Sequence, residues 1–172
     1  MNSKMGRITA SWMFWALTTM VGACASDTGD GDDGAGDGSS RCGELNTEPG
    51  PTMRPGQNCL SCHYEGFRDE LMAPNWTAAG TVFDAADSEH CDGVEGVSVF
   101  LTAEDGSEVE LVTNEVGNFW TDEPLMEEGP GPRLEYEGRT IKMARNLPAI
   151  PACAGCHANP PQASAPGRIF AP

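Results

Sequence analysis

The stretch that decides the fold is GVEGVSVFLTAEDGSEVELVTNEVGNFW, residues 93–120. Within it, SEVELV (107–112) alternates as a strand with one solvent-facing side does. Asp105-Gly106 and the run from Asn114 to Gly117 supply turn residues between the apolar runs. The pattern therefore predicts short antiparallel strands rather than helices.

Runs rich in β-branched and aromatic residues continue this pattern on both sides. They lie at 78–85, 96–103, 107–113, 117–122, 132–138 and 139–144. About six strands at this spacing predict a mainly β protein with an antiparallel β-sandwich of immunoglobulin-like architecture over residues 76–144.

The order of these elements resembles the carboxypeptidase regulatory-like family, which has a transthyretin-type β-sandwich. The matching parts are Gly80-Thr81-Val82, Gly96-Val97-Ser98-Val99, Asp105-Gly106 and Thr113 to Phe119, within residues 78 to about 143. The domains of that family mostly serve as structural or binding modules. The resemblance thus implies a scaffold and supplies no catalytic residues.

Two copies of a C-x-x-C-H motif lie outside this region: CLSCH at 59–63 and CAGCH at 153–157. The chain has only three histidines, and two of them directly follow the second cysteine of a C-x-x-C. This spacing is typical of c-type haem attachment, in which two cysteine sulfurs form thioethers with the haem vinyl groups and the histidine binds iron. The sequence predicts two covalent haems, with the cofactor-binding residues Cys59, Cys62, His63, Cys153, Cys156 and His157, of which His63 and His157 are the proximal iron ligands.

Pro- and Gly-rich sequence surrounds both motifs, so we expect each to form a short turn or a single helical turn. Residues 42–75 would form the first haem segment, and residues 145–172 the second haem segment with a Pro-rich tail. A three-bridge disulfide framework is the main alternative for an exported chain, and a four-thiolate zinc site is another. If both motifs hold haem, Cys42 and Cys91 remain as a pair, for which a disulfide is the simplest assignment.

A sixth iron ligand would separate an electron carrier from an enzyme. Candidates are Met143, which precedes the second motif and could reach the first haem, and His90, the one histidine outside the motifs. An open axial site would instead favour a haem-based sensor or a small peroxidase. The sequence shows no acid/base constellation for such chemistry, so we predict no catalytic residues.

The N-terminal residues predict export. Residues 1–23 resemble a lipoprotein-type signal peptide, with Lys4 and Arg7 before an apolar run that ends in Val21-Gly22-Ala23-Cys24. Cys24 would be lipidated, and residues 24–41, rich in Asp and Gly, would form a disordered acidic tether.

The net charge of the chain limits the kinds of partner that it can bind. With 26 Asp and Glu against 10 Lys and Arg, the chain would not be held by charge on nucleic acid or an anionic membrane. We therefore expect a membrane-anchored lipoprotein, in the periplasm or at the outer membrane of a Gram-negative-type bacterium, that exchanges electrons with redox proteins bearing basic docking surfaces. A haem-free binding module stapled by disulfides or zinc stays open as an alternative.

Overall fold

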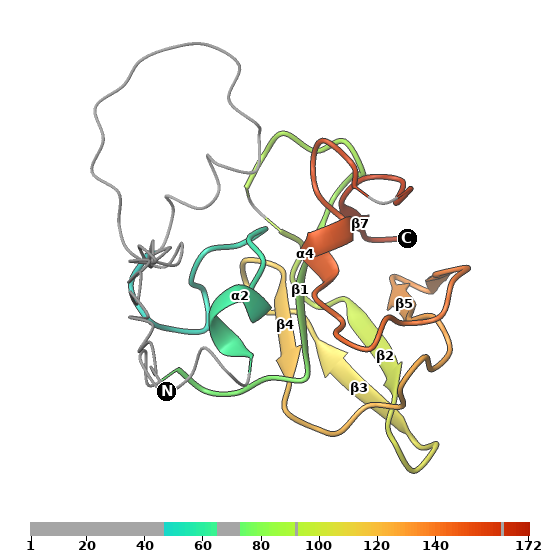
Figure 1. Ribbon diagram of the computed structural model, residues 1–172. Coiled ribbons are helices and arrows are strands. Elements are labelled where there is room, and N and C mark those ends of the chain that lie inside the picture. The colour runs from blue at the N-terminus through green and yellow to red at the C-terminus, as the bar shows by residue number, and fades with distance from the viewer. Residues whose placement is uncertain (1–46, 65–72, 92, 163) are drawn as a thin grey trace, which may run out of the picture.

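The computed structural model describes residues 47–64, 73–91, 93–162 and 164–172, and it is mainly β (Figure 1). The predicted signal peptide, Cys24, the acidic tether and Cys42 lie outside the described residues. The elements are, in chain order, α2 (Leu60–His63), β1 (Ala78–Phe83), β2 (Ser98–Thr102), β3 (Glu108–Val112), β4 (Asn118–Thr121), β5 (Arg133–Tyr136), β6 (Arg139–Lys142), α4 (Cys153–Cys156) and β7 (Ile169–Phe170).

The strands form two sheets. The first has the order β4-β1-β7, with β1 antiparallel to β4 and parallel to β7. The second has the order β3-β2-β5-β6 and is antiparallel throughout. Antiparallel neighbours can be joined by short turns, which the Gly and Asn residues between the strands supply.

Both sheets contribute to one hydrophobic core. Val82 and Phe119 come from the first sheet, and Val99, Leu101 and Leu134 come from the second. Every residue of β1 is buried, whereas burial in β2 and β3 alternates along the strand. Strand β1 is thus the most buried element, and segments that bond to it are fixed to the core of the protein.

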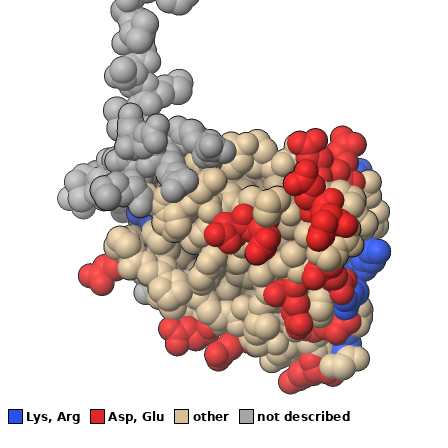
Figure 2. Space-filling model, turned by 90° about the horizontal axis from the view of Figure 1, so that it is seen from below, with Lys and Arg blue, Asp and Glu red and all other residues tan. Residues whose placement is uncertain are grey.

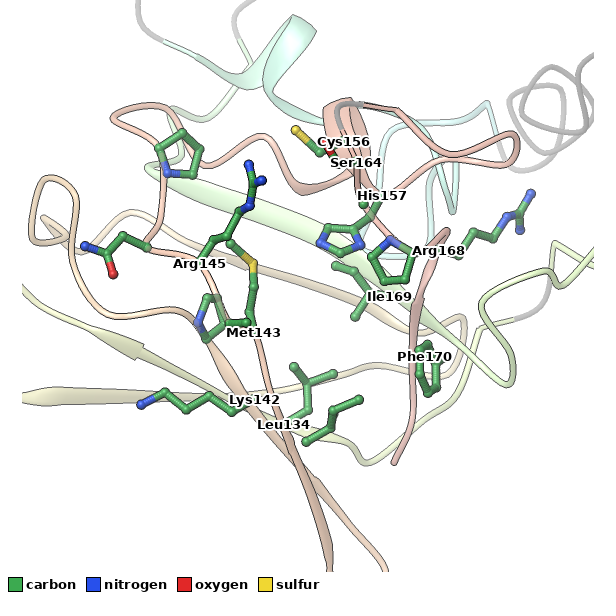
Figure 3. Close-up of a pocket in the computed structure, with 17 residues that line it drawn as sticks. Leu134, Lys142, Met143, Arg145, Cys156, His157, Ser164, Arg168, Ile169 and Phe170 are labelled. Atoms are coloured by element: carbon green, nitrogen blue, oxygen red, sulfur yellow. The ribbon is translucent and has the colours of Figure 1, made fainter.

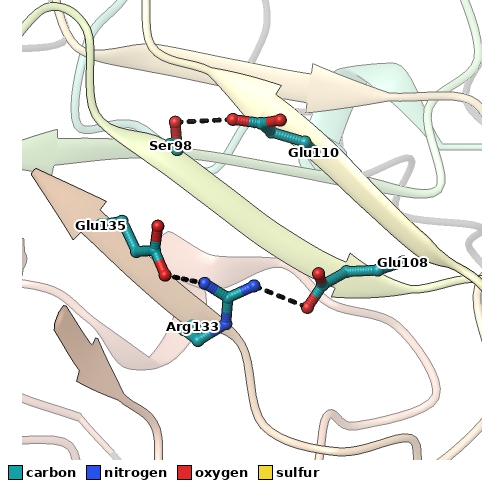
Figure 4. A network of polar contacts seen from close by, with 5 residues as sticks. All are labelled: Ser98, Glu108, Glu110, Arg133 and Glu135. Carbon is teal, nitrogen blue, oxygen red and sulfur yellow. Dashed lines mark hydrogen bonds and ion pairs between the residues drawn. The ribbon is translucent and has the colours of Figure 1, made fainter.

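The outer face of the second sheet is polar. Arg133 bonds Glu108 at 2.8 Å and also pairs with Glu135, while the hydroxyl of Ser98 donates to Glu110 at 2.8 Å (Figure 4). The Arg133 guanidinium also lies 3.7 Å over the centre of the Phe100 ring. These contacts bridge β2, β3 and β5 on the side away from the core.

All six predicted strands are confirmed, and the two motifs form single helical turns, as expected. Strand β7 was not predicted. It is two residues long and lies in the Pro-rich tail, where its parallel pairing with Val82 and Phe83 carries no local sequence signal.

Candidate functional site

The two C-x-x-C-H copies share one backbone hydrogen bond. The amide of His63 donates to the carbonyl of Cys59 at 2.9 Å, and the amide of His157 donates to that of Cys153 at 2.8 Å. One i to i+4 hydrogen bond closes each turn. The two cysteines and the histidine of each motif are therefore held within one helical turn.

Both copies of the motif are attached to strand β1 through the residues that precede them. The amide of Gly56, just before the first motif, donates to the hydroxyl of Thr81 at 2.8 Å. Ala152, just before the second, forms a parallel bridge with Ala79. An ideal Cβ on Gly155 would lie 3.9 Å from the side-chain nitrogen of Asn58, so the two motifs are also neighbours. The fold brings together segments that are about ninety residues apart in sequence (Figure 1).

Both histidines use Nδ1 to bond a backbone carbonyl. The partner of His63 is Pro74 O at 3.0 Å, and that of His157 is Gly167 O at 2.9 Å. A carbonyl oxygen can only accept, so Nδ1 carries a proton in each ring, and Nε2 is the nitrogen with the lone pair in the corresponding neutral tautomer. Histidines that bind metals commonly have this arrangement, which sets the tautomer and the ring orientation.

The surroundings of the two rings differ. His63 is 8 % exposed and stacks on Trp76, with ring centres 3.8 Å apart and planes 9° from parallel. Trp76 stacks in turn on Trp120 of β4 at 5.3 Å, and its amide donates to the carbonyl of His63 at 2.7 Å. Residues 74–76 thus hold His63 by a hydrogen bond to its ring, a hydrogen bond to its backbone and a ring stack.

His157 instead lines a pocket of about 560 Å³ (Figure 3). Cys156 and Met143 line the same pocket, and Figure 3 shows the Met143 thioether and the His157 imidazole projecting into it. The walls come from β5, β6 and the C-terminal segment, and most are apolar. They include Leu134, Ile141, Ala165, Pro166, Ile169 and Phe170.

The described cysteines fall into two groups. Cys59, Cys153 and Cys156 are free thiols. Burial raises the pKa of Cys59 to about 11 and that of Cys153 to about 12, and the nearby Cys59 thiol adds to the shift at Cys153. Both thiols are thus protonated near neutral pH and are poor sources of metal-binding thiolate.

Cys62 and Cys91 are each disulfide-bonded. A disulfide at Cys91 is in keeping with its predicted role, although the predicted partner, Cys42, lies outside the described residues. The disulfide at Cys62 differs from the expectation that this sulfur binds haem. A sulfur in a disulfide carries no S–H, so the first motif offers one free thiol in this structure and the second offers two.

The two candidate distal ligands lie in different places. His90 is on an exposed segment, where its carbonyl accepts a hydrogen bond from Arg168 at 2.7 Å, and it does not line the pocket of His157. Met143 lies in that pocket. It follows Lys142, the last residue of β6, and this places it beside the second motif, whereas the sequence suggested that it could reach the first haem.

Several residues of the site were not predicted from sequence. Trp76 and Pro74 contact His63, and Gly167 bonds His157, but none has a distinctive spacing from its motif. The one available signal was a tryptophan two residues before a buried strand. Arg145 lines the pocket and was not predicted as a site residue either.

Among the described residues, no group of three or more His, Cys, Asp and Glu side chains is arranged to hold a metal ion. No helix in the described part of the chain has the length and apolar character needed to cross a membrane. No protein-family model, curated protein or solved structure matches this chain.

Proposed function

We propose that this protein is an exported electron carrier that binds covalent c-type haem at its C-x-x-C-H motifs. One observation carries the proposal: His157 keeps its Nε2 free by bonding Gly167 through Nδ1, and it lines an apolar pocket together with Cys156 and Met143. Haem, when bound, would supply the iron that gains and loses an electron. The chain would orient the ligand, exclude water and set the potential.

The second motif fits a haem in three respects. Cys153 and Cys156 are free, as thioether formation requires, because each S–H adds across a vinyl double bond. The pocket walls are apolar, which suits a porphyrin face and favours burial of a flat ring. His157 is in the tautomer that a proximal ligand needs.

Met143 is the proposed sixth ligand of the second haem. Its thioether and the imidazole of His157 share one pocket, and Met with His is a ligand pair that raises the reduction potential of iron. A six-coordinate iron favours electron transfer over sensing or peroxidase chemistry. His90 is not proposed as a ligand, since it lies away from this pocket.

The first motif fits a haem in part. His63 has the required tautomer, and Cys59 is free. Cys62 must first be released from its disulfide, which takes two electrons and two protons from a dithiol reductant. We therefore propose two haem sites, of which the second can load with its thiols as they stand.

The remaining parts of the proposal concern scaffold, partners and location. We propose that the two sheets form a transthyretin-type sandwich and that Cys24 anchors the chain to a membrane of the bacterial envelope. Several clusters of Asp and Glu are spread over the face in Figure 2, and most of the visible Lys and Arg lie along one edge. Basic redox proteins would dock on such a surface, with rates that fall as salt screens the attraction.

The experiment is expression of the full chain with haem-attachment machinery, followed by intact mass and the reduced absorption spectrum. We expect covalent haem that is lost from the second motif in Cys153→Ala/Cys156→Ala. Cys59→Ala is the matched control, because it removes a free, partly buried thiol of the other motif. A chain that carries no covalent haem would refute the proposal.

A second candidate function follows from the disulfides at Cys62 and Cys91. These bonds are what a haem-free module stapled by disulfides would contain. The same mass measurement decides: a chain without haem, in which further cysteines are oxidised, would favour the module.

A further inference from the structure

The pocket beside His157 has a charge opposite to that of the chain. Its charged lining residues are Lys142, Arg145 and Arg168, with no Asp or Glu, whereas the whole chain has 26 acidic and 10 basic residues. If the lining had the chain's average composition, most of its charged residues would be acidic. The pocket is thus apolar with cationic side chains, which suits an apolar ligand that carries anionic groups.

Arg168 is already engaged in packing. It is 3 % exposed, its Nη1 donates to the carbonyl of His90 at 2.7 Å, and its guanidinium lies 4.1 Å from the centre of the Phe83 ring. Figure 3 shows this side chain directed away from His157. Arg168 therefore holds the segment of His90 against β1 and is not aimed at a ligand.

Arg145 is placed differently. It is exposed, and within the described parts of the chain its side chain has no ion pair and no hydrogen bond. Figure 3 shows it on the side of the pocket where Met143 lies, with its guanidinium toward Cys156. Lys142, the last residue of β6, is a second exposed cation at this pocket.

We propose that Arg145, assisted by Lys142, binds the carboxylates of the ligand that occupies this pocket. The inference rests on the proposed function, in which that ligand is haem, an apolar ring with two carboxylates. A carboxylate at the edge of an apolar pocket loses water and needs a compensating cation, and a guanidinium offers paired N–H donors for it. Arg145 is thus a positioning residue that determines which edge of the ring faces solvent.

The test compares free haem with its dimethyl ester, which has the same ring without negative charges. The full chain carrying Cys153→Ala/Cys156→Ala cannot form thioethers at the second motif and changes the pocket lining only at position 156. Its affinity for each probe is measured by absorption titration. The haem-free chain with all its cysteines serves as a second background. His157→Ala, made in either background, removes the imidazole from this pocket, so the probe binding that remains measures binding at other places on the chain.

The matched control is Arg139→Gln. Arg139 begins β6, the strand that ends at Lys142, and its side chain is 65 % exposed, 3.9 Å from Glu137, outside the pocket. Arg139→Gln and Arg145→Gln therefore remove the same charge from the same hairpin region.

We expect Arg145→Gln to weaken haem binding by about 10-fold or more, as loss of a charged hydrogen bond does, and to leave binding of the diester within about 2-fold. Lys142→Gln should act in the same direction and more weakly, and Arg139→Gln should change neither affinity. Equal effects of Arg145→Gln on both probes, no effect on either, or no binding of either probe would overturn the inference. Covalent loading is measured by mass in the full chain, so these results are separable from failure of the proposed function.

Discussion

Gly80 in β1 offers the most direct test of how the second motif is held. A Cβ at this position would lie 2.9 Å from Cβ of Cys153 and 2.9 Å from Cζ of Phe119, closer than side-chain carbons normally approach. Neither neighbour can move freely, because Phe119 is in the core and Cys153 begins α4. Gly80→Ala should therefore push α4 away from β1.

The size of the effect follows from two opposing terms. Overpacking of a filled core costs about 1–3 kcal/mol, and replacing a strand glycine recovers about 0.5–1 kcal/mol of chain entropy. We expect the free energy of unfolding of the haem-free chain to fall by about 1–2 kcal/mol. Gly155→Ala is the control, since its Cβ would lie 3.8 Å from Ala152 and 3.9 Å from Asn58, which is ordinary contact.

Urea unfolding measures the stability, and the labelling rate of the Cys153 thiol reports the docking of α4. Gly80→Ala should lower the urea midpoint and speed labelling, whereas Gly155→Ala should leave both close to wild type or raise the midpoint slightly. A Gly80→Ala chain with an unchanged midpoint and an equally protected Cys153 would show that α4 is not packed on β1 as described.

Three further predictions concern the scaffold. Thr81→Val should lower the free energy of unfolding by about 1–3 kcal/mol in urea, because the Thr81 hydroxyl accepts from the amide of Gly56 at 2.8 Å. Thr81→Ser keeps a hydroxyl and should retain most of that stability, so equal losses in the two variants would contradict this. The haem-free chain should lose stability as pH rises above 9. Folding raises the pKa of Cys59 from 9.0 to about 11 and that of Cys153 from 9.0 to about 12, so above pH 9 these thiols ionise more readily in the unfolded chain, which is thereby favoured. Urea midpoints on both sides of pH 9 check this, and Cys153→Ala should flatten the pH dependence; an equal slope in wild type and variant would refute it. Glu108→Gln should leave the thermal midpoint unchanged, because exposed ion pairs contribute little, and a clear drop would show that the network is more strongly coupled than its exposure implies.

The strands could be predicted because their signals are local. Alternation in 107–112 and the turn residues at 105–106 and 114–117 are readable in short windows, and the structure has strands and turns there. Strand β7 could not be predicted, since its pairing with β1 joins residues almost ninety positions apart and the Pro-rich sequence around it gives no strand pattern. Pairings of this kind depend on the closed core and not on propensity.

In the candidate site, too, the local patterns could be predicted from the sequence and the contacts between distant residues could not. The motif residues themselves are a local pattern, and each forms the expected helical turn. The carbonyl of Pro74, the ring of Trp76 and the carbonyl of Gly167 are tertiary partners, which no spacing indicates. The disulfide at Cys62 belongs to the alternative of a disulfide framework, because the C-x-x-C-H spacing assigns that sulfur to haem and cysteine spacing alone does not give the pairing.

The proximity of the two motifs is a consequence of β1 being the central strand of its sheet. Its two edges are taken by β4 and β7, so both the chain before the second motif, through Ala152, and the chain after it, through β7, are tied to β1. The first motif is tied to the same strand through Thr81. A strand buried along its whole length is the least mobile support that a small sheet offers, because every displacement exposes apolar surface. Groups attached to these two turns would therefore be held at a nearly constant separation.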